Sequence, residues 1–297
     1  MTNIKMRYFS ELHPTVSMLY FVSVLALTLT CRHPIMCGLS LIGAILFSHR
    51  LRGTKAVKMT MCFVAPMFLL IALANPLFCH KGVTMLFMIN HQWYTLEAIL
   101  YGLVSAMQLS AVVFWFTCYQ EVMTSDKFLY LFGKIAPGAS LLITMTLRLI
   151  PVLQEQGKII SETHQLLQEK DKRLFQKLGT ALRNLSTLLT WSMENAVVTA
   201  DSMKARGYGL FRRTTFHLFH FDSRDGRTLG IMLSLSGIVL IGRLFGHGYM
   251  EFYPHMEKVI TGIPGIIMYF VFMALVLLPS VLEIKEEIIW RSYGFAN

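Results

Sequence analysis

Charged residues are scarce in this sequence. Only 15% of the 297 residues are Asp, Glu, Lys or Arg, whereas soluble domains usually carry about 25%. Hydrophobic residues make up 54% of the chain, and the mean hydropathy is +0.53. These values are not expected of a soluble globular domain, and they predict a membrane protein.

Motifs for metal, disulfide and nucleotide chemistry are also missing. No C-x-x-C spacing relates the five cysteines, so neither a zinc site nor a disulfide framework is indicated. The chain has no G-x-x-x-x-G-K-[ST] phosphate loop and no H-E-x-x-H motif. We therefore expect no catalytic residues, no metal and no cofactor on this chain. The five cysteines are Cys31, Cys37, Cys62, Cys79 and Cys118.

Long apolar runs are abundant by contrast. A helix that crosses a membrane needs roughly 20 mostly apolar residues. About six segments predict such helices: 15–31, 35–48, 57–75, 96–118, 228–248 and 260–282. The second segment is short, so it either re-enters the membrane or pairs with the first segment through the turn CRHPI. The predicted fold is an all-α membrane protein.

The basic residues set the predicted orientation, because cytoplasmic loops carry an excess of Lys and Arg. With the N-terminus inside, the outer loops hold only Arg32, Lys81 and Lys258, and Arg243 lies within a span. All other Lys and Arg residues fall on the inner side, so both termini are predicted to be cytoplasmic. The net charge of +10 does not predict nucleic-acid binding, since the cations form neither a tail nor a surface with stacking side chains.

The predicted spans divide the chain into three regions. The middle one is cytoplasmic, and it is too amphipathic to hide its own apolar surface as a soluble domain. Long amphipathic helices are therefore expected there, between spans four and five. The regions are 1–118 (membrane), 119–227 (cytoplasmic) and 228–297 (membrane).

Three helical pieces are predicted within the cytoplasmic region, at 139–155, 156–172 and 177–207. The first piece contains Arg148 and Pro151. Because proline kinks a helix, these two residues are predicted to form a structural hinge that turns the chain out of the membrane.

The third piece has an apolar stripe at steps of three and four residues, which places the stripe on one helical face. Side chains become smaller toward its C-terminal end, and small residues allow another helix to cross closely. An amphipathic helix that lies on the membrane surface explains the same pattern. The predicted helix-crossing face consists of Leu189, Met193, Ala196, Ala200 and Met203.

The sequence ADSMKARGYG (200–209) ends this helix and leaves the role of Arg206 open. Glycine commonly follows the last helical turn, and a cation there faces the negative end of the helix dipole. Arg206 nevertheless lies off the apolar stripe, and its guanidinium can bind a carboxylate through two parallel hydrogen bonds. Arg206 is therefore either a helix cap or a docking residue.

ADSMKARGYG resembles the Ala-Arg-Gly motif of the transmembrane T subunit of energy-coupling factor (ECF) transporters, the EcfT/CbiQ family. Other segments resemble the family in the same order, so the similarity extends over nearly the whole chain. They are ELHPTVSMLYFVSVLALTLTCRHP, NPLFCHKGVTMLF and TSDKFLYLFGKIAPGASLLITMTLRLIPVLQEQ.

The resemblance implies a non-catalytic membrane scaffold in a bacterial cell membrane. Such a subunit joins two cytoplasmic ABC-type ATPase subunits, which hold ATP and Mg, to a small membrane S component that binds the substrate. The substrate is a vitamin or a transition-metal ion such as cobalt or nickel. The long cytoplasmic helices are then coupling helices, which transmit the closing motion of the ATPases.

The family implies two arginine motifs, each of which docks in a groove of one ATPase. The second motif corresponds to Ala205, Arg206 and Gly207. The first would fall near residues 166–168, where this chain has Leu-Leu-Gln instead. Either a later cation docks there or that ATPase is held by apolar contacts. The candidate cations are Lys170, Lys172 and Arg173.

Two other classes of protein remain as alternatives. A membrane-embedded enzyme acting on a phosphorylated lipid or isoprenoid would need clustered acidic metal ligands such as D-x-x-D on its spans, and none is found. A secondary transporter would need ionisable groups at mid-membrane and repeated halves, which the predicted spans lack.

Overall fold

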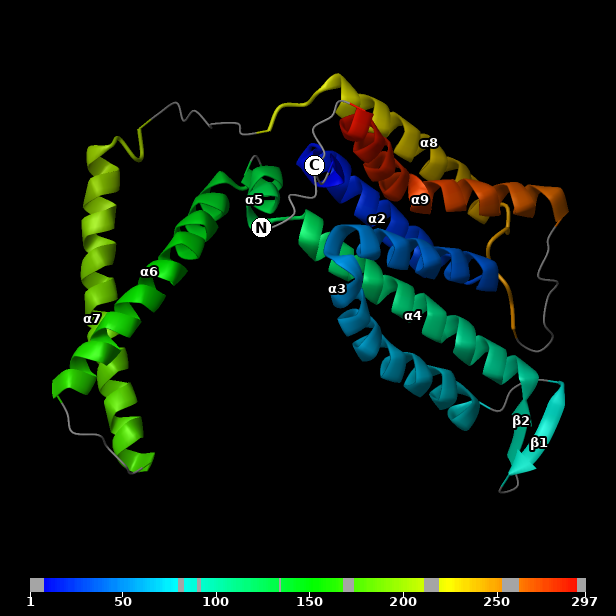
Figure 1. The fold of residues 1–297 in the computed structure, drawn as a ribbon, viewed down its shortest axis with the longest axis horizontal. Coiled ribbons are helices and arrows are strands. Elements are labelled where there is room, and N and C mark those ends of the chain that lie inside the picture. The colour runs from blue at the N-terminus through cyan, green and yellow to red at the C-terminus, as the bar shows by residue number, and fades with distance from the viewer. Residues whose placement is uncertain are drawn as a thin grey trace. The chain divides into compact units, whose positions relative to one another are not determined.

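The computed structural model describes residues 8–79, 83–89, 92–133, 135–167, 174–210, 219–252 and 262–292. The chain folds as two compact units (Figure 1). Unit 1 comprises Met1–Phe128 with Phe219–Asn297, and unit 2 comprises Leu129–Leu218. The second unit is thus an insertion between two parts of the first.

Unit 1 is a helical bundle with one β-hairpin. Its elements are α1 (Tyr8–Glu11), α2 (Pro14–Thr30), α3 (Pro34–Phe78), β1 (Met85–Ile89), β2 (Gln92–Thr95), α4 (Leu96–Val122), α8 (Ser223–Leu244) and α9 (Gly262–Ser292). Helix α5 (Ser125–Gly133) leads into unit 2, which contains α6 (Pro137–Leu167) and α7 (Leu174–Ala205). The two strands pair antiparallel.

Five helices among the described residues are long and apolar enough to cross a membrane, namely α3, α4, α6, α8 and α9. The chain is therefore a multi-pass membrane protein built almost entirely of helices, as the composition predicts. Helices α4, α8 and α9 contain most of the predicted spans 96–118, 228–248 and 260–282. Helix α6, which was predicted to be cytoplasmic, meets the same condition of length and composition.

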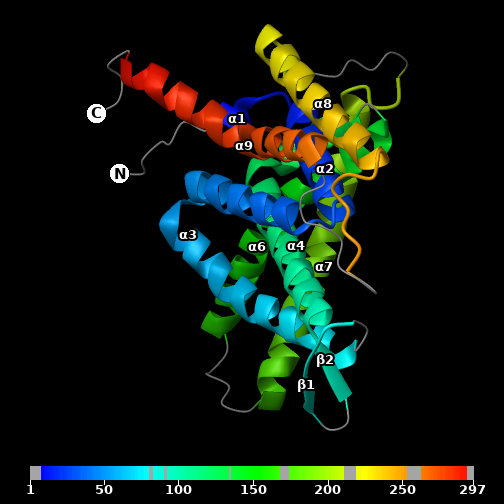
Figure 2. The same ribbon diagram turned by 90° about the vertical axis from the view of Figure 1, so that its right-hand side faces the viewer.

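Two of the predicted spans lie in one element. Helix α3 has 45 residues and is broken at Gly53, whose φ of 77° is not helical. The predicted spans 35–48 and 57–75 lie on opposite sides of this break, and Figure 2 shows the two arms at a marked angle. The first arm begins at Pro34, so the short predicted segment is part of a longer helix. Helix α2 has 17 residues, a length of about 26 Å.

The pair His-Pro starts both α2 and α3. His13 and His33 are the N-cap residues, and Pro14 and Pro34 follow at the first helical position. Proline is favoured there because its missing N–H would have no partner in the helix. In α2, the His13 ring nitrogen also accepts a hydrogen bond from the Thr15 N–H at 3.3 Å. These sequence pairs therefore fix where two helices begin.

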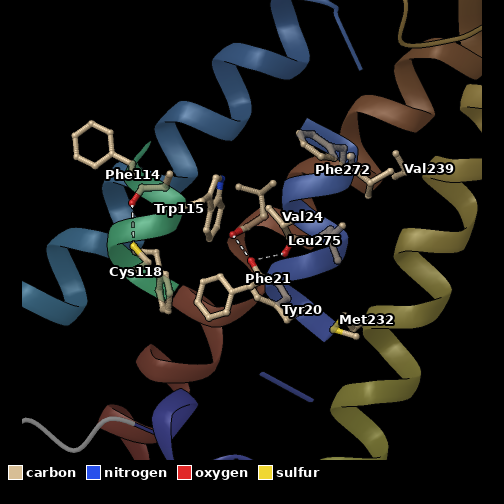
Figure 3. Close-up of a cluster of buried hydrophobic side chains, with 14 of the residues drawn as sticks. Tyr20, Phe21, Val24, Phe114, Trp115, Cys118, Met232, Val239, Phe272 and Leu275 are labelled. Atoms are coloured by element: carbon tan, nitrogen blue, oxygen red, sulfur yellow. Dashed lines mark hydrogen bonds between the residues drawn. The ribbon is translucent and has the colours of Figure 1, made fainter. Parts of the chain in front are cut away.

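Aromatic side chains fill the centre of unit 1 (Figure 3). The ring of Tyr20 packs edge-on against Phe21 and Trp115, with centroids 5.5 and 6.0 Å apart. Phe9, from the short helix α1, packs edge-on against Tyr20 at 5.2 Å. Residues from α1, α2, α4, α8 and α9 thus share one core.

Hydrogen bonds between helices accompany this packing. The Tyr20 hydroxyl on α2 donates to the carbonyl oxygens of Leu275 and Val276 on α9, both at 3.3 Å. Trp115 Nε1 on α4 donates to Ser40 Oγ on α3 at 3.0 Å. Ser40 Oγ in turn pairs with Thr28 Oγ1 on α2 at 2.9 Å. Such bonds hold apolar helices together where lipid removes the hydrophobic drive for association.

Glycines allow the closest helix crossings in unit 1. A Cβ on Gly102 of α4 would lie 2.8 Å from the Ala72 carbonyl oxygen of α3, and 3.1 Å from Asn75 Cβ. Asn75 Nδ2 donates to the Ala98 carbonyl at 2.8 Å beside this crossing. Because the nearest atom belongs to the main chain, it cannot move away by changing a rotamer.

We expect Gly102→Ala to destabilise the protein by about 1–3 kcal/mol, because it overpacks the crossing of α3 and α4. The matched control is Gly38→Ala on α3, where an added Cβ meets nothing within 4 Å. Thermal unfolding in detergent, followed by circular dichroism, compares the two variants. Equal melting temperatures would contradict the close crossing.

Candidate functional site

Helix α7 ends in a cap made by the main chain. The Tyr208 N–H donates to the Met203 carbonyl at 3.0 Å, and the Gly207 N–H donates to the Lys204 carbonyl at 2.9 Å. Gly207 has a φ of 85°, in the left-handed region that glycine adopts without strain. These are the two hydrogen bonds of a Schellman motif, and Arg206 occupies its C-cap position.

Helix α8 ends in the same way, with Phe245 rather than a cation at the C-cap position. The His247 N–H donates to the Gly242 carbonyl and the Gly246 N–H to the Arg243 carbonyl, both at 3.1 Å. Gly246 has a φ of 87°, and Phe245 takes the position that Arg206 has in α7. The caps RGYG and FGHG are therefore equivalent, and their closure does not require an arginine side chain.

The Arg206 side chain is exposed to solvent. It forms no ion pair with any residue that the structure describes. Arg206 is also off the apolar stripe of α7, as its position in the sequence predicts. The guanidinium is thus presented at the end of a long helix, with all its donors available to a carboxylate.

Helices α6 and α7 cross in unit 2 (Figure 1). At the crossing, a Cβ on Gly157 of α6 would lie 3.8 Å from Leu188 Cδ2 of α7. Leu188, Trp191 and Asn195 are half-buried and lie on one side of α7, because they are three and four residues apart. This side adjoins the predicted apolar stripe but is not the same face.

The predicted helix-crossing face is largely open among the described residues. Leu189 is 55% exposed and Met193 is 73% exposed. Ala196 and Ala200 are also exposed, and Met203 is half-buried. The crossing of α6 leaves this face uncovered among the described residues, so the prediction that a helix packs there stays a prediction.

The predicted hinge residues and the candidate docking cations lie on other parts of the chain than Arg206. Arg148 and Pro151 are exposed on α6, which continues through Pro151 as one helix. The pieces predicted at 139–155 and 156–172 are consequently one element rather than two, up to Leu167. Lys170, Lys172 and Arg173 lie outside the described residues.

A buried lysine holds the beginning of the chain next to the entry to unit 2. Lys127, on α5, donates from Nζ to the Ser10 carbonyl and, at 3.1 Å, to the Val122 carbonyl. Val122 ends α4, where a cation is favoured by the helix dipole. Burial lowers the pKa of the Lys127 ammonium, and the Glu11 carboxylate opposes this shift.

A buried carboxylate holds the same segment next to the return from unit 2. Asp225 Oδ1 accepts from the His13 N–H at 3.2 Å, and Oδ2 accepts from the Asp222 N–H at 3.1 Å. Asp222 and Asp225 form a capping box at the start of α8, and Phe221 packs edge-on against the His13 ring at 5.4 Å. We call residues 8–14 the anchor segment.

The anchor segment thus joins two parts of the chain that are about a hundred residues apart. Lys127 precedes unit 2 and Asp225 follows it, and both bond to the anchor segment. Sequence reasoning missed both residues. The spacing Asp222-x-x-Asp225 before an apolar run is a recognisable capping signal, whereas nothing in the polar stretch around Lys127 indicates burial.

The described residues contain no group of three or more His, Cys, Asp or Glu side chains that could hold a metal ion. His220 is exposed, while His217 lies outside the described residues. A comparison of the sequence with protein-family models and with curated proteins finds no match. Functional inference therefore depends on the geometry of this chain and on the sequence resemblance.

We expect Gly207→Ala to destabilise the C-terminal turn of α7 by about 1–2 kcal/mol, because φ at this position is positive. The new Cβ would also lie 3.2 Å from Leu210 Cδ1. Arg206→Ala should change stability by less than about 0.5 kcal/mol. Hydrogen exchange of the Gly207 and Tyr208 amides measures both effects. Faster exchange in Arg206→Ala than in Gly207→Ala would contradict a main-chain cap.

Lys127→Met should lower the free energy of unfolding by about 2 kcal/mol, because it removes the ammonium that donates to the Ser10 and Val122 carbonyl groups. Lys158→Met is the control, since Lys158 is exposed and forms an exposed i,i+4 ion pair with Glu162. Thermal unfolding in detergent compares the variants. A Lys127→Met protein as stable as the control would show that the anchor segment does not depend on this ammonium.

Proposed function

We propose that this chain is the transmembrane scaffold of an ATP-driven importer, equivalent to the T subunit of energy-coupling factor transporters. It joins two cytoplasmic ATPase subunits to a membrane S component that binds a vitamin or a transition-metal ion. The chain itself is not an enzyme, and ATP and Mg are held by the partner ATPases. The chain is located in a bacterial cell membrane, with both termini in the cytoplasm.

The observation that carries this proposal is the arrangement at Arg206. The helix end is closed by main-chain hydrogen bonds, so the exposed guanidinium is not needed for the fold. The guanidinium of Arg206 is planar and permanently charged, and it stands at the end of a long helix. Such a helix end is suited to insertion into a groove lined by carboxylates. Gly207 and Gly209, with φ of 85° and 100°, keep the chain narrow beyond Arg206. The sequence ADSMKARGYG carries the resemblance to the family motif.

The open apolar face of α7 supports a second contact. Leu185 and Leu189 are more than half exposed, as are Met193 and Val197. A contiguous apolar face of this kind marks an interaction surface. In the proposed complex the S component covers this face, while Arg206 points to an ATPase. The two contacts use different sides of one helix, so a displacement of the ATPase would move the surface that holds the S component.

The anchor segment supplies the rigidity that such a scaffold needs. Lys127 and Asp225 fix the two connections to unit 2 onto one short segment of unit 1. In the proposed complex, a force transmitted from unit 2 would reach unit 1 next to residues that these buried hydrogen bonds hold in place. We regard both as positioning residues for the coupling.

The test is a pull-down of the candidate ATPase subunits of the same genome with the detergent-solubilised chain. Wild type should retain both ATPases. Arg206→Glu should reduce affinity by roughly 100-fold or more, because loss of one partner of a desolvated charge pair costs about 3 kcal/mol. Arg206→Lys should retain part of the affinity, since a single ammonium replaces the fork.

Arg183→Glu is the matched control, because Arg183 is also an exposed arginine on α7. This variant should bind as wild type does. Equal retention by Arg206→Glu and the control would reject Arg206 as a docking residue. Failure of the wild type to retain any ATPase would reject the scaffold function itself.

A further inference from the structure

The second arm of α3 has two lysines at its start, followed by an apolar stripe on the same side. Lys55, Lys58, Met59, Phe63 and Leu70 are all exposed. Their spacing of three, four and seven residues places them on one face of the helix. The face is therefore cationic at one end and apolar along the rest.

The neighbouring arginines are already paired. Arg50 forms an ion pair with Glu287 of α9 at 3.2 Å, and Arg52 forms one with Glu121 of α4 at 3.8 Å. Lys55 and Lys58 form no ion pair within the described part of the chain. The two lysines thus carry positive charge that no carboxylate described in this protein neutralises.

The side chains of the apolar stripe are largely exposed. Met59 is 80% exposed, Phe63 is 69% exposed and Leu70 is 67% exposed. The opposite side of this arm packs on α4, where Val64 is buried and Ala72 approaches Gly102. The stripe consequently faces away from the bundle, toward the space that lipid occupies around a membrane protein.

The dimensions match one leaflet of a bilayer. The twelve steps from Lys58 to Leu70 rise about 18 Å along the helix. Half of the hydrocarbon core of a bilayer is about 15 Å thick. Two cations at the top of an apolar stripe of this length correspond to an anionic headgroup above an alkyl chain.

We propose that Lys55 and Lys58 bind the phosphate of an anionic glycerophospholipid, whose acyl chain lies along Met59, Phe63 and Leu70. The break at Gly53 positions the site, because its φ of 77° begins a new helix whose first turns hold the lysines. The arginine pairs fix the preceding turn to α4 and α9. The site belongs to unit 1 alone and does not depend on the proposed transport function.

The order of groups along the helix selects this ligand. A zwitterionic lipid brings its own cation and gains little from two lysines, whereas an anionic lipid gains about 1 kcal/mol from each. An acidic protein segment would pair with the lysines but would leave the stripe below them bare. The lipid accounts for both ends of the same face.

The experiment titrates the detergent-solubilised full chain with short-chain phosphatidylglycerol, phosphatidylcholine or glycerol phosphate, and measures the melting temperature at each concentration. Ligand that binds the folded state raises this temperature. Phosphatidylglycerol should stabilise wild type more than phosphatidylcholine does. The double variant K55Q/K58Q should bind phosphatidylglycerol roughly 30-fold more weakly, and the effect should shrink at high salt.

Two further variants separate the parts of the site. K158Q/K285Q removes two exposed lysines elsewhere and should bind phosphatidylglycerol as wild type does. Phe63→Ser should weaken phosphatidylglycerol binding and leave any glycerol phosphate binding unchanged. Equal binding of both phospholipids by wild type, or equal binding of phosphatidylglycerol by K55Q/K58Q and K158Q/K285Q, would overturn the proposal. A response to glycerol phosphate as strong as to phosphatidylglycerol would overturn the acyl contact.

Discussion

Buried hydrogen bonds between apolar helices are the constraint on which unit 1 depends. Water is absent from the bilayer core, and lipid is as apolar as leucine, so burial of apolar surface gives the helices little reason to associate. Close packing and polar contacts must fix their arrangement instead. Helix α2 occupies the centre of this network, since Tyr20 bonds to α9 and Thr28 is joined through Ser40 to Trp115 of α4. The close crossing at Gly102 is a separate contact of α4, with the arm of α3 that follows the break at Gly53.

The same principle extends to the edge of the bundle, where charged groups replace hydroxyl groups. Lys127 and Asp225 are both buried, and each bonds to main-chain groups of the anchor segment. A buried charge is tolerated only when hydrogen bonds compensate its lost hydration. The geometry therefore concentrates strong, short-range interactions at the two places where the chain leaves and re-enters unit 1.

Sequence patterns predict the membrane character, most of the spans and the position of Arg206. They do so because spans and helix ends depend on local features, namely apolar length, His-Pro pairs and glycine. They fail where a contact joins distant segments. They also fail for α6, whose apolar half and polar half look like two separate pieces in the sequence. In the structure these halves are one helix, and residues 137–164 are long and apolar enough to cross a membrane. The Glu97 carboxylate accepts hydrogen bonds from the Thr84 N–H at 3.1 Å and from the Thr84 hydroxyl at 2.7 Å. No local sequence pattern predicts this contact. No local pattern predicts that Lys127 is buried, or that Leu188 rather than Leu189 lies where α6 crosses α7.

The equivalence of the caps on α7 and α8 has a consequence for how the proposed contact of Arg206 with an ATPase could diversify. Because the main chain closes each helix end, the residue before the first glycine carries no structural duty, and arginine and phenylalanine occupy it with the same backbone geometry. In the proposed complex, mutation at position 206 could therefore follow changes in the ATPase without disrupting the end of α7. After a gene duplication, two copies of this chain could come to bind different ATPases. One copy would need an anion at position 206, and its ATPase would need a cation in place of the carboxylate. Because position 206 is not needed for the fold, the same charge exchange could be engineered, so that two such complexes assemble in one cell without sharing subunits.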